Sequence, residues 1–229
     1  PRALPWQRNL EHHLAISPEP SARRSFLDCF GNRITKIHFT ADHEYLEIIS
    51  EFWVELDARP KPSAAAAKVP WETVRDSLRY RADRKFPPDH LQATAFRFVS
   101  TNVPIDSQYA AYAREAFLPG RPLVEAAEAL MQMIHRDFRF DATATETFTP
   151  VEQAFKARRG VCQDFSHIMI ACLRSVGLAA RYMSGYILTH PPEGKERLVG
   201  ADATHAWVAV FVPDFGWLEL DPTNALRPD

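Results

Sequence analysis

Hydrophobic and polar residues alternate with a period of two through most of residues 1–56, which is the pattern of β-strands with two distinct faces. The alternation is clearest at 45–56, where hydrophobic residues occupy one face and glutamates alternate with large hydrophobic residues on the other. We expect long side chains to cover both faces of this strand. Gly31 and Asn32 favour a hairpin turn within 26–39. The pattern predicts a small antiparallel β domain over 1–56.

Residues 57–70 have no strand pattern and contain three prolines and a run of four alanines. This composition is typical of a linker, although a run of alanines can also form a helix. From residue 71 the hydrophobic spacing changes to three and four, which is typical of helices. The segments with this spacing are 71–78, 109–117 and 122–134. The change of period predicts a second domain over 71–229.

The hydrophobic pattern predicts helices and then strands in the C-terminal part of the chain. Thr-Pro-Val-Glu at 149–152 has the form of a capping box and predicts a short helix that ends near Ala157. An apolar stripe predicts the next helix from Val161 or Cys162 to Gly177. The period then returns to two at about 180–188, 204–212 and 217–221. Helices followed by an antiparallel sheet make an α+β fold.

Three residues in this part of the chain have the chemistry of a thiol-dependent enzyme. Cys162 lies in the first turn of its predicted helix, where unpaired N–H groups and the helix dipole favour a thiolate and a developing oxyanion. His205 can accept the thiol proton and later return it to a leaving amine. Asp221 can accept a hydrogen bond from the other ring nitrogen and so orient the imidazole. We interpret Cys162, His205 and Asp221 as nucleophile, base and orienting residue.

This interpretation requires a strand register that places His205 and Asp221 on the same face of the sheet. If Val212 pairs with Trp217 across a four-residue turn, Asp221 faces away from His205. A shift of one residue, from a three- or five-residue loop or a bulge, places both side chains on one face as diagonal neighbours. We therefore predict a loop of odd length, or a bulge, near 213–216.

Simpler interpretations remain open for several residues. Cys162 could be a small buried residue at the start of a helix, and Cys172 and Cys29 are expected to be packing residues. His167 follows Cys162 by five positions, which points it elsewhere on the helix and suggests a structural role. Aromatic residues at alternate strand positions usually lie in the core. Even so, Gln163, Tyr186 and Trp207 are candidates for binding the substrate.

Composition excludes some classes of function. The 229 residues include 46% hydrophobic and 24% charged residues, enough for a sizeable core, and the net charge of −2 gives no reason to expect nucleic acid or membranes as partners. No apolar run reaches the length of about 18 residues that a membrane span needs. The three cysteines lack a paired spacing, which fits reduced thiols and predicts a cytoplasmic location. No spacing of acidic residues suggests a calcium site, so we expect no metal and no cofactor.

Four motifs together carry a resemblance to a known family. They are Gly-Val-Cys-Gln-Asp-Phe-Ser-His at 160–167, Arg-Tyr-Met-Ser-Gly-Tyr at 181–186, Asp-Ala-Thr-His-Ala-Trp at 202–207 and Asp-Pro-Thr-Asn at 221–224. The chain resembles the bacterial transglutaminase-like proteins, and 1–56 is similar to the β-rich N-terminal region found in one branch of them. The resemblance implies a papain-like core and a triad of Cys162, His205 and Asp221. It also implies that the chain is cut at both ends.

The most concrete expectation is acyl transfer through a thioester on peptide or glutamine-type amides, without a cofactor. Water as the acceptor would make the protein a cysteine protease or deamidase, which we favour, and an amine would make it a transglutaminase. One alternative is a non-catalytic binding or scaffold protein of the same fold. Another is an acetyl-transfer enzyme with a similar triad, against which Gln163-Asp164-Phe165 argues. The expected partner is a peptide or protein substrate, and the sequence leaves the oligomeric state open.

Overall fold

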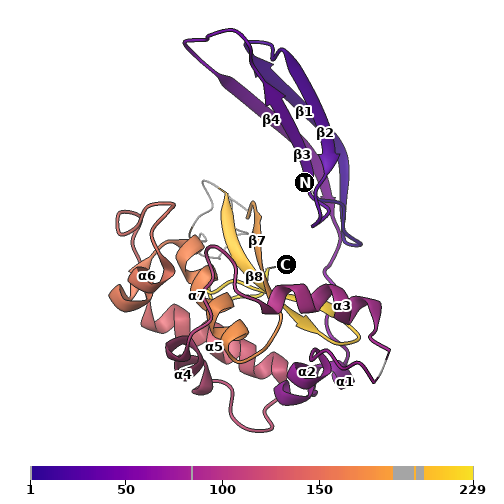
Figure 1. The fold of residues 1–229 in the computed structure, drawn as a ribbon, viewed down its shortest axis with the longest axis vertical. Helices are drawn as coiled ribbons and strands as arrows, with labels where there is room; N and C mark the ends of the chain where they lie inside the picture. The colour runs from indigo at the N-terminus through magenta and orange to yellow at the C-terminus, as the bar shows by residue number, and fades with distance from the viewer. Residues whose placement is uncertain (1, 84, 188–198, 200–203, 229) are drawn as a thin grey trace. The chain divides into compact units, whose positions relative to one another are not determined.

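The protein forms two compact units, 1–60 and 61–228, in the computed structural model (Figure 1). The structure describes residues 2–83, 85–187, 199 and 204–228. The expected linker at 57–70 differs from this boundary, because its second half packs into the second unit. Helix α1, Ala64–Ala67, begins where the Ser63 hydroxyl accepts a hydrogen bond from the N–H of Ala66, and Ala66 joins the core.

The first unit consists of antiparallel strand pairs. Strand β1, Gln7–Ser17, pairs with β4, Glu47–Leu56, while β2, Ala22–Leu27, pairs with β3, Arg33–His38. The predicted turn around Gly31 joins β2 and β3. Its Asp28 carboxylate accepts hydrogen bonds from two backbone N–H groups, and Gly31 adopts a positive φ of 80° that favours glycine. The antiparallel β domain is therefore confirmed as a fold.

Two expectations for the first unit are wrong. Neither face of β4 is covered along its length, since Ile48 is 50% exposed and Trp53 is 69% exposed. Two-stranded pairs have too few layers to enclose such side chains. Cys29 is exposed in the turn after β2 rather than packed in a strand.

Helices make up the first part of the second unit. Their bounds are α2, Trp71–Ser77; α3, Pro88–Thr94; the short 3-10 helix η1, Ala95–Arg97; α4, Ser107–Arg114; α5, Leu123–Asp137; α6, Val151–Ala157; and α7, Cys162–Ser175. Strands β5, Arg139–Phe140, and β6, Arg159–Gly160, form a short parallel pair just before α7. The expected capping box of α6 is not formed, because the Thr149 hydroxyl accepts from the N–H of Glu146 instead.

A three-stranded antiparallel sheet follows the helices. Its strands are β7, Ala180–Gly185; β8, His205–Val212; and β9, Gly216–Leu220, in the order β7-β8-β9. Val212 pairs with Gly216, so a three-residue loop joins β8 and β9. Gly216 has a φ of 100°, which favours glycine at this turn. The predicted loop of odd length is confirmed.

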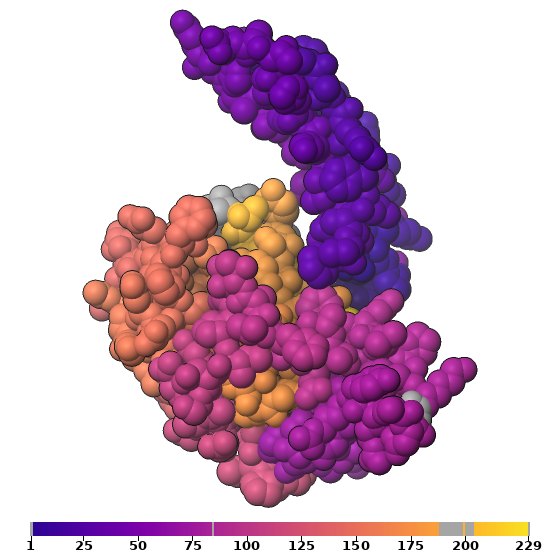
Figure 2. Space-filling view, viewed as in Figure 1, coloured from indigo at the N-terminus to yellow at the C-terminus, as the bar shows by residue number. Residues whose placement is uncertain are grey.

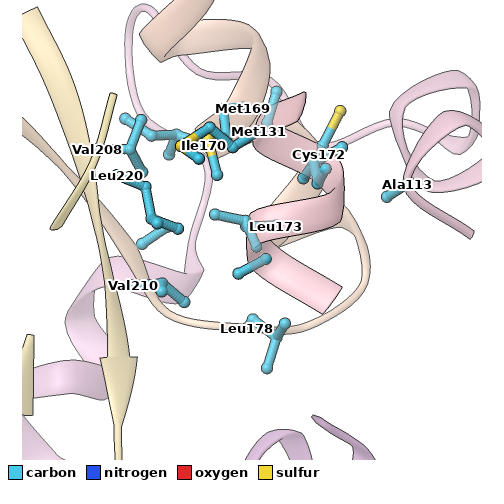
Figure 3. Close-up of a cluster of buried hydrophobic side chains, with 14 of the residues drawn as sticks. Ala113, Met131, Met169, Ile170, Cys172, Leu173, Leu178, Val208, Val210 and Leu220 are labelled. Atoms are coloured by element: carbon cyan, nitrogen blue, oxygen red, sulfur yellow. The ribbon is translucent and has the colours of Figure 1, made fainter. Parts of the chain in front are cut away.

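Helix α7 is the centre of the hydrophobic core. Residues 168–173 of this helix are fully buried. Figure 3 shows Val208, Val210 and Leu220 of the sheet on the side of α7 that carries Ile170 and Leu173. The apolar contacts hold the helix against the sheet, and so the first turn of α7 has a fixed position relative to the strands.

Hydrogen bonds hold the segment that follows η1 against the C-terminal end of α7. Arg174 donates hydrogen bonds to the carbonyl oxygen of Phe98 (2.8 Å) and to the hydroxyl of Ser100 (3.0 Å). The same guanidinium donates to the carbonyl oxygen of Ala180 at the start of β7. Figure 2 shows the magenta stretch that contains this segment on the surface, beside the orange of β7. Arg174 thus ties a surface segment, a helix and a strand together.

Candidate active site

The first turn of α7 presents Cys162 half-buried at the surface of the second unit. Val161 precedes it in an extended conformation, and its N–H donates a 2.8 Å hydrogen bond to Oδ2 of Asp164, at the third helical position. The Thr145 hydroxyl donates to the same oxygen at 2.6 Å. This buried carboxylate therefore fixes both the start of the helix and the loop that precedes α6.

Gly160 leaves room for this arrangement. A Cβ atom at Gly160 would lie 2.5 Å from Oδ2 of Asp164, far inside contact distance. Sequence reasoning did not identify a role for Asp164 at the site. An acidic residue at the third position of a helix that starts without Ser, Thr, Asp or Asn at its cap is the signal that could have identified Asp164.

The structure brings His205 and Asp221 together. Nε2 of His205 lies 2.8 Å from Oδ2 of Asp221, and both side chains are almost completely buried. Val208 pairs with Leu220, which makes these two side chains diagonal neighbours on one face of the sheet. The backbone register that follows from the three-residue loop thus produces the contact.

The Asp221 carboxylate is held on its other side as well. Its Oδ1 accepts from the N–H groups of Thr223 (2.9 Å) and Asn224 (3.3 Å), and its Oδ2 accepts from the Asn224 side chain (2.7 Å). These three donors hold the carboxylate in one orientation. Asp221 is therefore suited to accept a hydrogen bond from the ring N–H of His205 in one fixed direction.

The Cys162 thiol interacts with His205 across the interface between α7 and β8. Burial alone would lower the pKa of His205, but the hydrogen bond with Asp221 and the nearby Cys162 outweigh it and raise the pKa from 6.5 to about 9. Because Nε2 bonds to Asp221, the buried Nδ1 is the nitrogen left for the thiol, and it has no hydrogen-bond partner among the described residues. The arrangement favours the protonated imidazolium form of His205.

Trp207 lies against His205 rather than at an open groove. The two rings stack with centroids 6.2 Å apart and planes inclined by 21°, and Trp207 is 7% exposed. Its Nε1 donates a 2.6 Å hydrogen bond to the buried carboxylate of Glu219 on β9. A Cβ atom at Gly185 would lie 2.7 Å from the Trp207 ring, so glycine is required beside it. Glu219 is a second residue that sequence reasoning did not identify.

The other two candidate binding residues differ in their surroundings. Gln163 donates from its side-chain amide to the carbonyl oxygen of Thr147 (2.9 Å) and also lines a cavity along α7. Tyr186 is 65% exposed just beyond β7. Asp202, part of the motif before His205, lies outside the described residues.

Two further findings concern cofactors and membranes. Among the residues that the structure describes, no group of three or more His, Cys, Asp or Glu side chains is placed to hold a metal ion. In the same part of the chain, no helix has both the length and the apolar character needed to cross a membrane.

Comparison with known protein families gives a match for each part of the chain. The transglutaminase-like superfamily core matches residues 110–222, which include Cys162, His205 and Asp221, and the bacterial transglutaminase-like N-terminal region matches residues 1–55. The chain belongs to the transglutaminase-like superfamily. The resemblance expected from the four motifs is confirmed for both parts of the chain.

Individual relatives align with different shares of this chain. An uncharacterized protein of Mycobacterium tuberculosis is 40% identical over 230 residues, which span 98% of this chain and 70% of the relative. A protein-glutamine gamma-glutamyltransferase of Pseudomonas aeruginosa is 31% identical over 112 residues, which are 48% of this chain and 17% of that protein. A crystal structure from Cytophaga hutchinsonii, provisionally described as a cysteine protease, covers 98% of this chain and 69% of its own, with a TM-score of 0.65 and 19% identity. The last likeness shows a shared fold.

Proposed function

We propose that the protein catalyses thiol-dependent acyl transfer on peptide or glutamine-type amides, with Cys162 as nucleophile, His205 as base and Asp221 as the residue that orients His205. The observation that carries the proposal is the buried hydrogen bond between Asp221 and His205, which leaves the second ring nitrogen of His205 available to the nearby thiol at the start of α7. The name of the Pseudomonas aeruginosa relative supports an amide of the glutamine type as substrate.

In the first half of the reaction, the Cys162 thiolate attacks the carbonyl carbon of the amide. The carbonyl oxygen becomes an oxyanion, which N–H groups in the first turn of α7 can stabilise. The C–N bond then breaks, and the leaving ammonia or amine takes the proton held by His205. The products of this half are a thioester at Cys162 and a neutral imidazole.

In the second half, His205 takes a proton from the acceptor, which attacks the thioester carbon. The C–S bond breaks, and the thiolate and imidazolium are restored. With water the product is a carboxylic acid, and with an amine it is a new amide. We favour water, since the first turn of α7 is reached from the surface and Cys162 is half-buried rather than enclosed.

The thiol is tested first, independently of any substrate. In a Cys29→Ser background, we expect iodoacetamide to alkylate Cys162 rapidly near neutral pH, and we expect His205→Ala to move the rate profile to higher pH. A Cys162 that is unreactive, or indifferent to His205→Ala, would contradict the proposal and favour a binding protein of the same fold.

The acceptor is tested next with a glutamine-containing peptide. We expect release of ammonia, with glutamate formed in the peptide, and little incorporation of an added primary amine. Predominant incorporation of the amine would identify a transglutaminase. Cys162→Ser, which removes the nucleophile, is the control for both products.

A further inference from the structure

A cavity of about 390 Å³ runs along one side of α7, beginning next to the candidate active site. We call it the α7 cavity. The residues that line it are Ser100, Thr101, Asn102 and Val103 after η1, Gln163, His167, Ile170 and Arg174 on α7, and Tyr182 on β7. Gln163 follows Cys162 directly, and Cys162 contributes electrostatically to the raised pKa of Tyr182. The α7 cavity therefore begins one residue along the helix from the thiol, although Cys162 itself does not line it.

His167 is a buried polar group without a partner in the α7 cavity. Its side chain is 9% exposed, and its ring lies 5.1 Å from the Tyr182 ring. Within the residues that the structure describes, neither ring nitrogen of His167 has a hydrogen-bond partner. Neither nitrogen is among the fully buried unpartnered atoms, so both are open to the cavity and can bond to water or to a ligand there.

Arg174 gives the α7 cavity its charge. This side chain is 8% exposed, and its hydrogen-bond partners are the uncharged oxygens of Phe98, Ser100 and Ala180. No acidic residue lines the cavity. Asp164 acts on His167 electrostatically, but its carboxylate is already used at the start of α7 and does not line the cavity. The positive charge of Arg174 is thus not balanced at the cavity wall.

The positions of His167 and Arg174 along α7 show how far the cavity lies from Cys162, where the amide would react. At a rise of 1.5 Å per residue, His167 and Arg174 lie about 7.5 Å and about 18 Å from Cys162 along the helix. An extended peptide advances by about 3.3 Å per residue. A group bound between His167 and Arg174 would therefore lie about two to five residues from the amide that reacts.

We propose that the α7 cavity binds a carboxylate of the peptide substrate, with Arg174 supplying the charge and His167 a hydrogen bond. The carboxylate comes either from an acidic side chain or from the C-terminus of the peptide. This inference rests on the proposed function for its substrate, but the binding itself requires no reaction. It makes the protein selective for peptides that carry a negative charge a few residues from the reacting amide.

The test measures peptide binding to the full chain carrying Cys162→Ser, by fluorescence anisotropy. The probes are labelled peptides with one glutamine among glycines, blocked at both ends, in which a glutamate stands two to five residues to either side. Matched probes carry glutamine in place of this glutamate, and a third set has no glutamate but a free C-terminal carboxylate. We expect the best acidic probe to bind at least about tenfold more tightly than its neutral match.

Substitutions locate the binding site. Asn102 lies on the exposed rim of the cavity, and Asn102→Asp adds a negative charge there without removing a described contact. We expect this substitution to weaken binding of the acidic probe by about fivefold or more. Gln153→Glu makes the same change at an exposed position of α6, outside the cavity lining, and serves as the control. His167→Phe keeps a ring beside Tyr182 but removes the ring nitrogens, and it should also weaken binding of the acidic probe.

The outcomes separate this inference from the proposed function. Equal binding of acidic and neutral probes, no binding of any probe at about 1 mM, or equal effects of Asn102→Asp and Gln153→Glu would overturn the carboxylate site. Each of these results leaves the alkylation test of Cys162 unaffected. Conversely, selective binding of the acidic probe by a chain whose Cys162 is unreactive would support the cavity while contradicting the enzyme. The third set of probes shows whether a side chain or a terminus supplies the carboxylate.

Discussion

Nε2 of His205 lies 2.8 Å from Oδ2 of Asp221, in a contact from which solvent is almost completely excluded. The pair joins the first residue of β8 to the residue just after β9. Hydrogen bonds from Thr223 and Asn224 hold the carboxylate in place on its other side. The orientation of the imidazole toward Cys162 is therefore set by the backbone of two strands and the turn that follows them.

Replacing Asp221 by asparagine should lower the pKa of His205 from about 9, because the charge that stabilises the imidazolium is lost. We expect acyl transfer, if it is observed, to fall by about 100-fold or more. The measurement is an NMR titration of the His205 ring together with the alkylation rate of Cys162. Asp214→Asn, at an exposed position of the β8–β9 loop, is the matched control and should change neither. An unchanged His205 pKa in Asp221→Asn would refute this coupling.

The stability of the second unit should depend on pH through His205. Its pKa is raised from 6.5 in an ordinary environment to about 9, so the folded state binds the proton more tightly than the unfolded state. The resulting stabilisation is complete below an ordinary histidine pKa and is lost as the pH rises through about 9. We expect the difference in unfolding free energy between the wild type and His205→Gln to shrink by roughly 3 kcal/mol over that interval. Urea unfolding at several pH values measures it, and a constant difference would contradict the raised pKa.

Trp207→Phe should destabilise the protein, because it preserves an aromatic ring beside His205 but removes the Nε1–H that donates to Glu219. Loss of this partner at a buried carboxylate is expected to cost about 1 to 3 kcal/mol of unfolding free energy. The same substitution at Trp53, which is 69% exposed, should change stability by less than about 0.5 kcal/mol. Equal effects at the two positions in urea unfolding would argue against the role of the Trp207–Glu219 hydrogen bond.

Gly160→Ala should disturb the start of α7. The added Cβ would overlap Oδ2 of Asp164, and so the carboxylate would have to leave the N–H of Val161 and the hydroxyl of Thr145. We expect a loss of about 2 kcal/mol in stability and slower alkylation of Cys162. Gly120→Ala is the comparison, since its Cβ would meet no atom within 4 Å and only the positive φ of 73° opposes it. That variant should lose about 1 kcal/mol and keep the reactivity of Cys162.

Alkylation of the native protein should distinguish its three cysteines. Cys172 is completely buried on α7, and burial raises the pKa of its thiol, so it should react only after unfolding. Cys29 is exposed in a turn and should react at the rate of an ordinary thiol. Mass spectrometry of peptides after brief exposure to iodoacetamide checks the order, in which Cys162 comes first. Rapid modification of Cys172 in the folded protein would contradict the packing described for α7.

The sequence by itself determined which three residues form the candidate site, because each of them sits in a distinctive local context. The position of Cys162 in the first turn of a helix follows from hydrophobic spacing within a single segment. His205 and Asp221 lie on neighbouring strands, and alternation of side chains limited the loop between them to an odd length or a bulge. Local periodicity and pairing rules were sufficient for these conclusions.

The tertiary structure decided what depends on contacts between distant segments. It showed that the loop between β8 and β9 has three residues, and it placed Glu219 where its carboxylate accepts a hydrogen bond from Trp207. It also brought the segment after η1 against α7, which created a cavity whose walls are more than 50 residues apart in sequence. Periodicity reports which face of an element is buried but not what covers it. The exposure of β4 and the surroundings of His167 were for that reason beyond the reach of the sequence, since both depend on how whole elements pack.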